Sequence, residues 1–155
     1  MTDLHDILAP EAVLERVGAG TRKALFQQLA AAAASAYGLD PAAVADVVGA
    51  REKLGSTGFG DGVATPHGKL PGLDHVCGVF ARLAQPIDFA SVDDLPVDIV
   101  FMLLSPPDAG AAHLKALARV SRALRDKAFV ANLRGAASRD ALVALLTAGQ
   151  ARDAA

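Results

Sequence analysis

Cysteine and aromatic residues are scarce in this chain, and their scarcity excludes several kinds of site. Cys77 is the single cysteine, so neither an intramolecular disulfide framework nor a paired-cysteine metal site can form. Tryptophan is absent and aromatic residues make up 5% of the chain, which leaves little material for stacking against bases or sugars. Disulfide scaffolds and recognition by aromatic stacking are therefore not expected.

Runs of one charge and long apolar segments are also missing. The chain carries 15 basic and 17 acidic side chains, a formal net charge of -2, and no long basic run. Nucleic acid is not expected as the principal partner, because binding to phosphate backbones needs clustered Lys and Arg. The longest apolar stretch, residues 29–36, is shorter than the ~20 residues of a membrane-spanning helix. With no signal peptide at the N-terminus, we expect a cytoplasmic protein with no direct membrane insertion.

Helix-like and strand-like segments alternate along a chain whose length fits one domain. Of its residues 52% are hydrophobic, which is enough to build a core. The predicted helices are residues 20–37, 41–54, 113–127 and 139–147, and the predicted strands are residues 76–83 and 97–104. This interleaving predicts a single α/β domain over residues 1–150, followed by a disordered tail over residues 151–155.

A glycine-rich segment followed by a histidine carries the strongest chemical signal. Residues 55–62 contain four glycines, which predicts a loop. Just beyond it, Pro66 and Gly68 flank His67. Arg51 and Lys69 supply positive charge on either side. Such a segment can bring an anionic group to a nucleophilic nitrogen. It offers positive charge, free backbone N–H groups and an imidazole, whose usual pKa is about 6.5.

Three familiar sequence motifs are not matched by this chain. Residues 62–70 resemble a nucleotide-binding P-loop, but five residues rather than four separate the glycines. Leu70 also stands where a Ser or Thr would hold Mg²⁺. Residues 58–62 have the wrong spacing for a dinucleotide-binding turn, and the chain has no serine-hydrolase GxSxG motif.

His113 is a second candidate, because it lies in the early turns of a predicted helix. Asp108 is expected to cap the start of that helix, whose N–H groups and dipole attract anions. The apolar stripe expected on this helix consists of Leu114, Leu117, Ser121 and Leu124. His113 lies at the edge of the stripe and can therefore face inward toward a site.

Plainer interpretations remain open for the same residues. Arg51 can cap the C-terminus of its own helix, and the glycine-rich segment can be a long turn. His5 and His75 are expected to be solvated or structural, and Cys77 to be an inert buried thiol. A zinc site from His67, His75 and Cys77 is a further alternative, although its spacing matches no familiar ligand pattern.

The order of these features resembles the active-site signature of a known family. The family is that of the IIA proteins of the bacterial phosphoenolpyruvate-dependent phosphotransferase system. The residues that resemble its signature are Arg51-Glu52, Gly55-Ser56-Thr57-Gly58 and Gly60-Asp61-Gly62-Val63-Ala64-Thr65-Pro66-His67-Gly68-Lys69. The resemblance is to the fructose/mannitol branch, and most closely to its free-standing nitrogen-related members. It extends over about residues 4–148 and includes Gln85–Phe89, Pro96–Phe101 and the His113–Leu117 helix.

The resemblance implies a mixed β-sheet flanked by helices and a phosphohistidine intermediate. His67 would accept a phosphoryl group from a phosphohistidine carrier protein, with His113 as the second active-site histidine and Arg51 steadying the phosphate. The expected phosphate-binding residues are Ser56, Thr57, Gly58, Gly68 and Lys69. Neither a metal nor another cofactor is required. Phe59 and Thr65 depart from the family's usual aliphatic residues without touching the three functional positions.

Two roles stay open for such a protein. With no fused transporter or carrier segment, we expect mainly a regulatory signalling protein whose phosphorylation state is read by target proteins. In the alternative, it is a catalytic relay that passes phosphate from the carrier to a sugar-transporter domain. A phosphoryl group adds a charge of about -1.5 to -2, which is enough to switch a protein interface.

Overall fold

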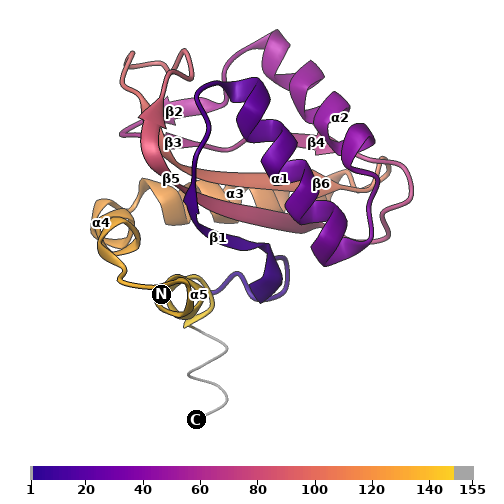
Figure 1. Ribbon diagram of the computed structural model, residues 1–155. Helices are drawn as coiled ribbons and strands as arrows, with labels where there is room; N and C mark the ends of the chain where they lie inside the picture. Colours follow the sequence, from indigo (N-terminus) through magenta and orange to yellow (C-terminus); the bar gives the residue numbers. More distant parts are fainter. Residues whose placement is uncertain (1, 149–155) are drawn as a thin grey trace.

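The chain folds around a mixed sheet with helices on both faces (Figure 1). The computed structural model describes residues 2–148, so the predicted tail over 151–155 lies outside the described residues. The strands are β1 (Val13–Val17), β2 (Gly58–Gly60), β3 (Val63–Ala64), β4 (His67–Lys69), β5 (Cys77–Ile87) and β6 (Val97–Ser105). The helices are the 3-10 turn η1 (Pro10–Ala12), α1 (Arg22–Tyr37), α2 (Pro41–Leu54), α3 (Ala111–Arg125), α4 (Lys127–Gly135) and α5 (Arg139–Leu146).

Strand β6 organises the sheet and sets the position of His67. The strand order is β1-β5-β6-β3-β2, and β4 pairs with β6 further along than β3. β5 runs antiparallel to β6, whereas β3 and β4 run parallel to it. Thr65 and Pro66 carry the chain from β3 to β4 along the same edge of β6. His67 therefore lies opposite Leu103, and the register fixes where its side chain leaves the sheet.

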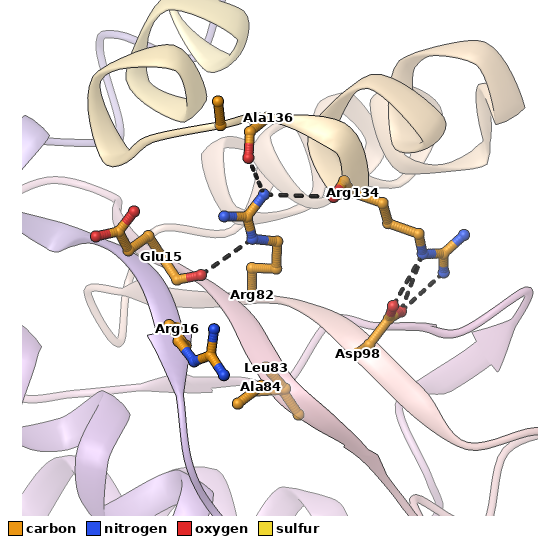
Figure 2. Close-up of a pocket in the computed structure, with 9 residues that line it drawn as sticks. Glu15, Arg16, Arg82, Leu83, Ala84, Asp98, Arg134 and Ala136 are labelled. Carbon is orange, nitrogen blue, oxygen red and sulfur yellow. Dashed lines mark hydrogen bonds and ion pairs between the residues drawn. The ribbon is translucent and has the colours of Figure 1, made fainter.

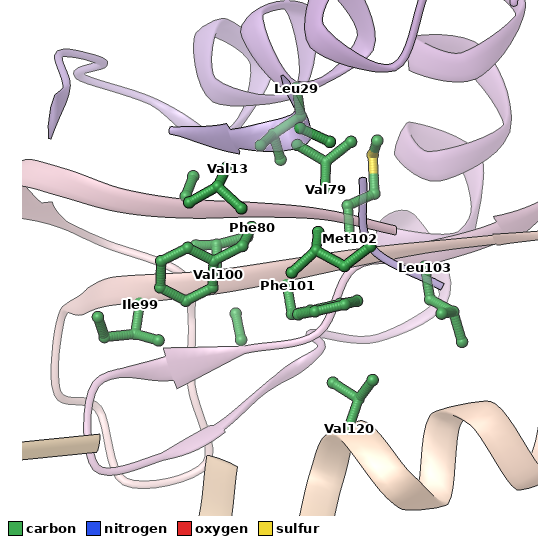
Figure 3. Close-up of a cluster of buried hydrophobic side chains, with 14 of the residues drawn as sticks. Val13, Leu29, Val79, Phe80, Ile99, Val100, Phe101, Met102, Leu103 and Val120 are labelled. Atoms are coloured by element: carbon green, nitrogen blue, oxygen red, sulfur yellow. The ribbon is translucent and has the colours of Figure 1, made fainter. Parts of the chain in front are cut away.

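The core lies on both faces of β5 and β6. Within β6, only Asp98 is partly exposed, which confirms the predicted two-sided burial of this strand. Figure 3 shows side chains of the two strands packed between Leu29 of α1 on one face and Val120 of α3 on the other. Because the helices on the two faces come from distant parts of the chain, the sheet holds the N-terminal and C-terminal halves together.

The predicted α/β class is confirmed, and so are the four predicted helices, each end lying within two residues of its expected position. Side-chain caps account for three of the starts. Thr21, Asp40 and Ser138 accept hydrogen bonds from backbone N–H groups in the first turns of α1, α2 and α5. In the described part of the chain, residues 2–148, no helix has the length and apolar character needed to cross a membrane.

Other expectations were wrong. Asp108 does not cap α3, because the capping position is held by Gly110 with φ 50° and no side-chain bond. The buried residues of α3 are His113, Ala116, Val120 and Leu124, and Leu114 is 66% exposed instead of buried. Residues 58–60 form strand β2 within the segment predicted as a loop. The chain also contains η1, β1, β3, β4 and α4, which were not predicted.

Candidate functional site

His67 begins β4 and is partly exposed. Its Nδ1 lies 2.9 Å from the backbone carbonyl oxygen of Thr65. A carbonyl oxygen can only accept a hydrogen bond, so Nδ1 must carry a proton and donate it. In the neutral ring, the free lone pair then lies on Nε2. The backbone just before β4 therefore fixes the tautomer of the neutral ring.

His113, from the first turn of α3, lies beside His67. The two ring centroids are 5.6 Å apart, and the ring planes are tilted by 53°. His113 is buried, and its Nδ1 lies 2.6 Å from the Oγ of Ser105 at the end of β6. Burial lowers the pKa of His113, and the neighbouring His67 and Lys69 lower it further. The neutral form of His113 is therefore favoured at neutral pH.

A cavity of about 520 Å³ joins the two histidines to the predicted cationic side chains. Its lining residues are Val47, Ala50, Arg51, His67, Gly68, Lys69 and His113. Among the described residues that line it, none is an aspartate or a glutamate. Two permanent cations without an opposing carboxylate make the cavity attractive to an anion.

Arg51 takes part in two arrangements at once. Its Nη1 donates a 2.8 Å hydrogen bond to the carbonyl oxygen of Gly55, just past the end of α2. The capping role that the sequence left open is thus present. A guanidinium has five N–H donors, so a single bond to Gly55 leaves donors for an anion in the cavity.

Gly68 allows α2 to approach β4 closely enough to bring Arg51 to the cavity. A Cβ at Gly68 would lie 3.0 Å from Cγ2 of Val47 and 3.4 Å from its backbone carbon. Arg51 follows Val47 by one helical turn and lies on the same face of α2. The absence of a side chain at Gly68 therefore allows the close contact between β4 and the helix that carries Arg51.

Ser56, Thr57 and Gly58 are not among the residues that line this cavity. Ser56 Oγ lies 2.5 Å from the carbonyl oxygen of Phe89 and accepts from the backbone N–H of Gly58. The backbone N–H and the hydroxyl of Thr57 both donate to the buried carboxylate of Glu52, at 3.0 and 2.8 Å. These bonds fix the glycine-rich segment to its surroundings, and the phosphate-binding role expected of the three residues stays a prediction.

Two polar residues near the site were missed by sequence reasoning. Glu52 holds the start of the glycine-rich segment through Thr57, and Ser105 contacts His113. Ser105 carried a usable signal, since it is a polar residue closing a strand that is otherwise buried and apolar. Glu52 stood in the signature run, but nothing in the sequence indicated that it is buried and bonded to Thr57, because a glutamate near a helix end is normally solvated.

The zinc alternative receives no support from the geometry. His75 is exposed and its Nδ1 pairs with Asp74, whereas Cys77 is buried in the core. Burial raises the pKa of the Cys77 thiol to about 12, as expected for an inert cysteine. Within residues 2–148, no three His, Cys, Asp or Glu side chains are arranged to hold a metal ion.

A second cavity, of about 490 Å³, lies at β1, β5 and the end of α4 (Figure 2). Two of the three arginines that line it, Arg82 and Arg134, are engaged in hydrogen bonds. Arg82 donates to the carbonyl oxygens of Glu15, Leu133 and Ala136, and Arg134 forms a paired contact with Asp98. These bonds tie the C-terminal helices to the sheet, which is a structural role. The cavity around His67 is therefore the better candidate for chemistry.

Known proteins resemble this chain over most of its length. The family model of the phosphoenolpyruvate-dependent sugar phosphotransferase system, EIIA 2, matches residues 6–149. A nitrogen regulatory protein of Bradyrhizobium diazoefficiens is 54% identical over 89% of this chain and 89% of its own length. A fructose-specific EIIA component of Haloferax volcanii is 33% identical, over 80% of this chain and 81% of its own length.

Solved structures share the fold of this chain. The nitrogen regulatory protein IIA-Ntr of Neisseria meningitidis has a TM-score of 0.87 and 33% identity, over 93% of this chain and 99% of that one. The mannitol IIA in a complex with phosphorylated IIB from Escherichia coli has a TM-score of 0.74 and 19% identity, over 90% and 98% of the two chains. The family match and the nitrogen regulatory relatives confirm the predicted resemblance to phosphoryl-accepting IIA proteins of the nitrogen-related branch. The chain belongs to the EIIA 2 family of the phosphoenolpyruvate-dependent sugar phosphotransferase system.

Proposed function

We propose that Nε2 of His67 accepts a phosphoryl group from a phosphohistidine carrier protein, and that target proteins read the phosphorylation state. The observation that carries this proposal is the hydrogen bond from His67 Nδ1 to Thr65 O. It leaves the Nε2 lone pair free beside Arg51 and Lys69, in a cavity with no carboxylate among its described lining residues.

The transfer needs no proton movement at His67. The Nε2 lone pair forms the new N–P bond while the bond between phosphorus and the carrier's histidine breaks, and the departing imidazole keeps that electron pair. Throughout, Nδ1 of His67 retains its proton and its bond to Thr65 O. Because the transition state is loose, catalysis depends mainly on positioning and on stabilising charge on the phosphoryl oxygens.

The residues around the cavity supply that stabilisation. Arg51 can donate in a planar fork to two phosphoryl oxygens, and Lys69 contributes a second positive charge. Gly68 leaves room beside the ring of His67. His113, whose ring lies against His67, is placed to hydrogen-bond the transferred group.

A phosphorylation assay tests the proposal. The protein is mixed with carrier phosphorylated from phosphoenolpyruvate, and acid-labile phosphate on it is measured. We expect uptake by the native protein and none by His67→Ala. His75→Ala is the matched control, because His75 is an exposed histidine outside the cavity, and it should behave as the native protein does. Uptake by His67→Ala would refute the assignment.

The relay role is the second candidate, and the likeness to a fructose-specific EIIA component supports it. The two roles predict different fates for the phosphoryl group. In a regulatory protein, a target should bind preferentially either the phosphorylated or the unphosphorylated form. In a relay, the phosphate should appear on imported sugar in a reconstituted membrane assay, and only if His67 is present.

A further inference from the structure

Ser105 is the last residue of β6 and contacts His113 of the site. It is fully buried and lies opposite Lys69 in the pairing of β4 with β6. Its Oγ is 2.6 Å from Nδ1 of His113, and this is a contact between two buried side chains. The backbone carbonyl of Ser105 accepts from the N–H of Leu70, so the residue is fixed at the point where β4 ends.

The direction of the bond between Ser105 and His113 follows from counting hydrogen-bond partners. Within residues 2–148, Ser105 Oγ has His113 Nδ1 as its one hydrogen-bond partner. If Nδ1 were the donor, the hydroxyl hydrogen of Ser105 would be buried without an acceptor, which is costly. If the hydroxyl donates to Nδ1, that hydrogen is satisfied, and the ring proton of neutral His113 lies on Nε2.

We infer that Ser105 is a positioning residue whose hydroxyl donates to His113 Nδ1 and so makes Nε2 of His113 a hydrogen-bond donor for the phosphoryl group on His67. This inference rests on the proposed function. The two neighbouring histidines then carry opposite tautomers. Thr65 O leaves His67 with a nucleophilic lone pair on Nε2, and Ser105 leaves His113 with an N–H on Nε2.

Opposite tautomers suit the chemistry better than equal ones. If both rings presented lone pairs to the cavity, His113 would repel the phosphoryl oxygens, which are acceptors only. A fixed donor aimed at the developing charge needs no reorganisation during transfer. Because burial favours neutral His113, its tautomer decides whether it attracts or repels the transferred group.

Nitrogen NMR of the unphosphorylated full-length chain tests the inference directly. Long-range proton–nitrogen correlations at about pH 8, well above the usual histidine pKa, distinguish protonated from unprotonated ring nitrogens. We expect Nε2 of His113 to be protonated in the native protein. Ser105→Ala should move the population toward protonated Nδ1, whereas Ser121→Ala, a hydroxyl loss elsewhere on α3, should not. A native His113 protonated on Nδ1, or an unchanged tautomer in Ser105→Ala, would overturn the inference.

Transfer kinetics give a second reading that a purely structural role would not produce. Ser105→Ala should lower kcat for phosphoryl transfer by about 10-fold while leaving KM for the carrier unchanged. Ser105→Thr keeps a hydroxyl and should recover both the tautomer and most of kcat. Unchanged kcat in Ser105→Ala would contradict the inference. The NMR experiment measures the tautomer without phosphate, so its outcome is independent of whether His67 accepts a phosphoryl group.

Discussion

Each histidine of the site takes its protonation pattern from one neighbouring oxygen. Thr65 contributes a backbone carbonyl, which accepts only, and Ser105 contributes a hydroxyl, which can donate. The contact with Thr65 does not depend on its side chain. This explains why a threonine there, where the family usually has an aliphatic residue, leaves the arrangement around His67 intact.

Arg51 can be tested for a role beyond capping with two substitutions. Arg51→Ala removes both the bond to Gly55 and the charge, whereas Arg51→Gln retains an N–H donor for Gly55 but no charge. If the guanidinium stabilises the transferred phosphoryl group, both variants should transfer about 10²-fold more slowly. Stopped-flow transfer from the phosphorylated carrier measures this rate.

The control for Arg51 comes from the same helical turn. Lys53 is exposed and does not line the cavity, so Lys53→Ala should transfer at the native rate. A native rate in Arg51→Gln would reduce Arg51 to a helix cap.

At the scale of elements, the close contact between α2 and β4 assembles the site. α2 supplies Arg51 and β4 supplies His67, and Gly68 lets them approach. His113, the second histidine of the site, belongs to α3, which covers the opposite face of the sheet. His67 therefore lies where one sheet edge meets the end of one helix and the start of another.

Gly68→Ala is expected to weaken this contact and destabilise the fold by about 1–3 kcal/mol, because the new methyl group crowds Val47. Urea denaturation measures the change. Adding Val47→Ala should restore part of the loss, since it removes the methyl group lying 3.0 Å from the new Cβ.

Gly49→Ala is the matched control on the same helix. No atom lies within 4 Å of a Cβ there, so alanine should stabilise α2 by about 0.5–1 kcal/mol. Equal changes in the free energy of unfolding for Gly49→Ala and Gly68→Ala would show that α2 and β4 are not in tight contact at Gly68.

Elements with their own local signals could be predicted, and elements set by distant contacts could not. The capped helices and the apolar β6 are of the first kind. β4 is of the second kind, since His67, Gly68 and Lys69 show no alternation and become a strand by pairing with β6. In α3, leucine spacing predicted a stripe beginning at Leu114, but the buried face begins one residue earlier.

Glycines can mark close packing as well as loops, and β2 illustrates the difference. The glycines at its two ends contributed to the prediction of a loop. A Cβ at Gly58 would come within 2.2 Å of Ser91 Oγ, so the absence of a side chain there serves a tight contact. For the site, the residue types near His67 were predictable. The positions of Ser56 and Gly58 depended on Phe89 and Ser91, far along the chain, and that of Thr57 on the unexpected burial of Glu52.

For the molecule as a whole, phosphorylation is a large electrostatic change. The chain has a formal net charge of -2, and a phosphoryl group adds about -1.5 to -2 more at one cavity. Under the proposed function, transfer to His67 would largely cancel the positive charge that Arg51 and Lys69 give this cavity. A partner docking there would then meet a different surface in each state, which is how the proposed regulatory readout would work.

Stability should depend on pH through His113. Burial lowers its pKa in the folded state below the value in the unfolded chain, so the unfolded chain binds more protons as the pH falls. This contribution to stability is present above the unfolded pKa of about 6.5 and is lost as the pH falls through the folded pKa. Urea denaturation between pH 7.5 and pH 5 should show a steeper fall for the native protein than for His113→Gln. Equal slopes would contradict this expectation.

The central claim is that His67 accepts a phosphoryl group on Nε2, and NMR of the phosphorylated, nitrogen-labelled protein tests it most directly. The scalar coupling between phosphorus and nitrogen identifies the bonded atom. We predict a coupling to Nε2 of His67, with Nδ1 still protonated toward Thr65 O. Coupling to Nδ1, or to a nitrogen of any other histidine, would contradict the account.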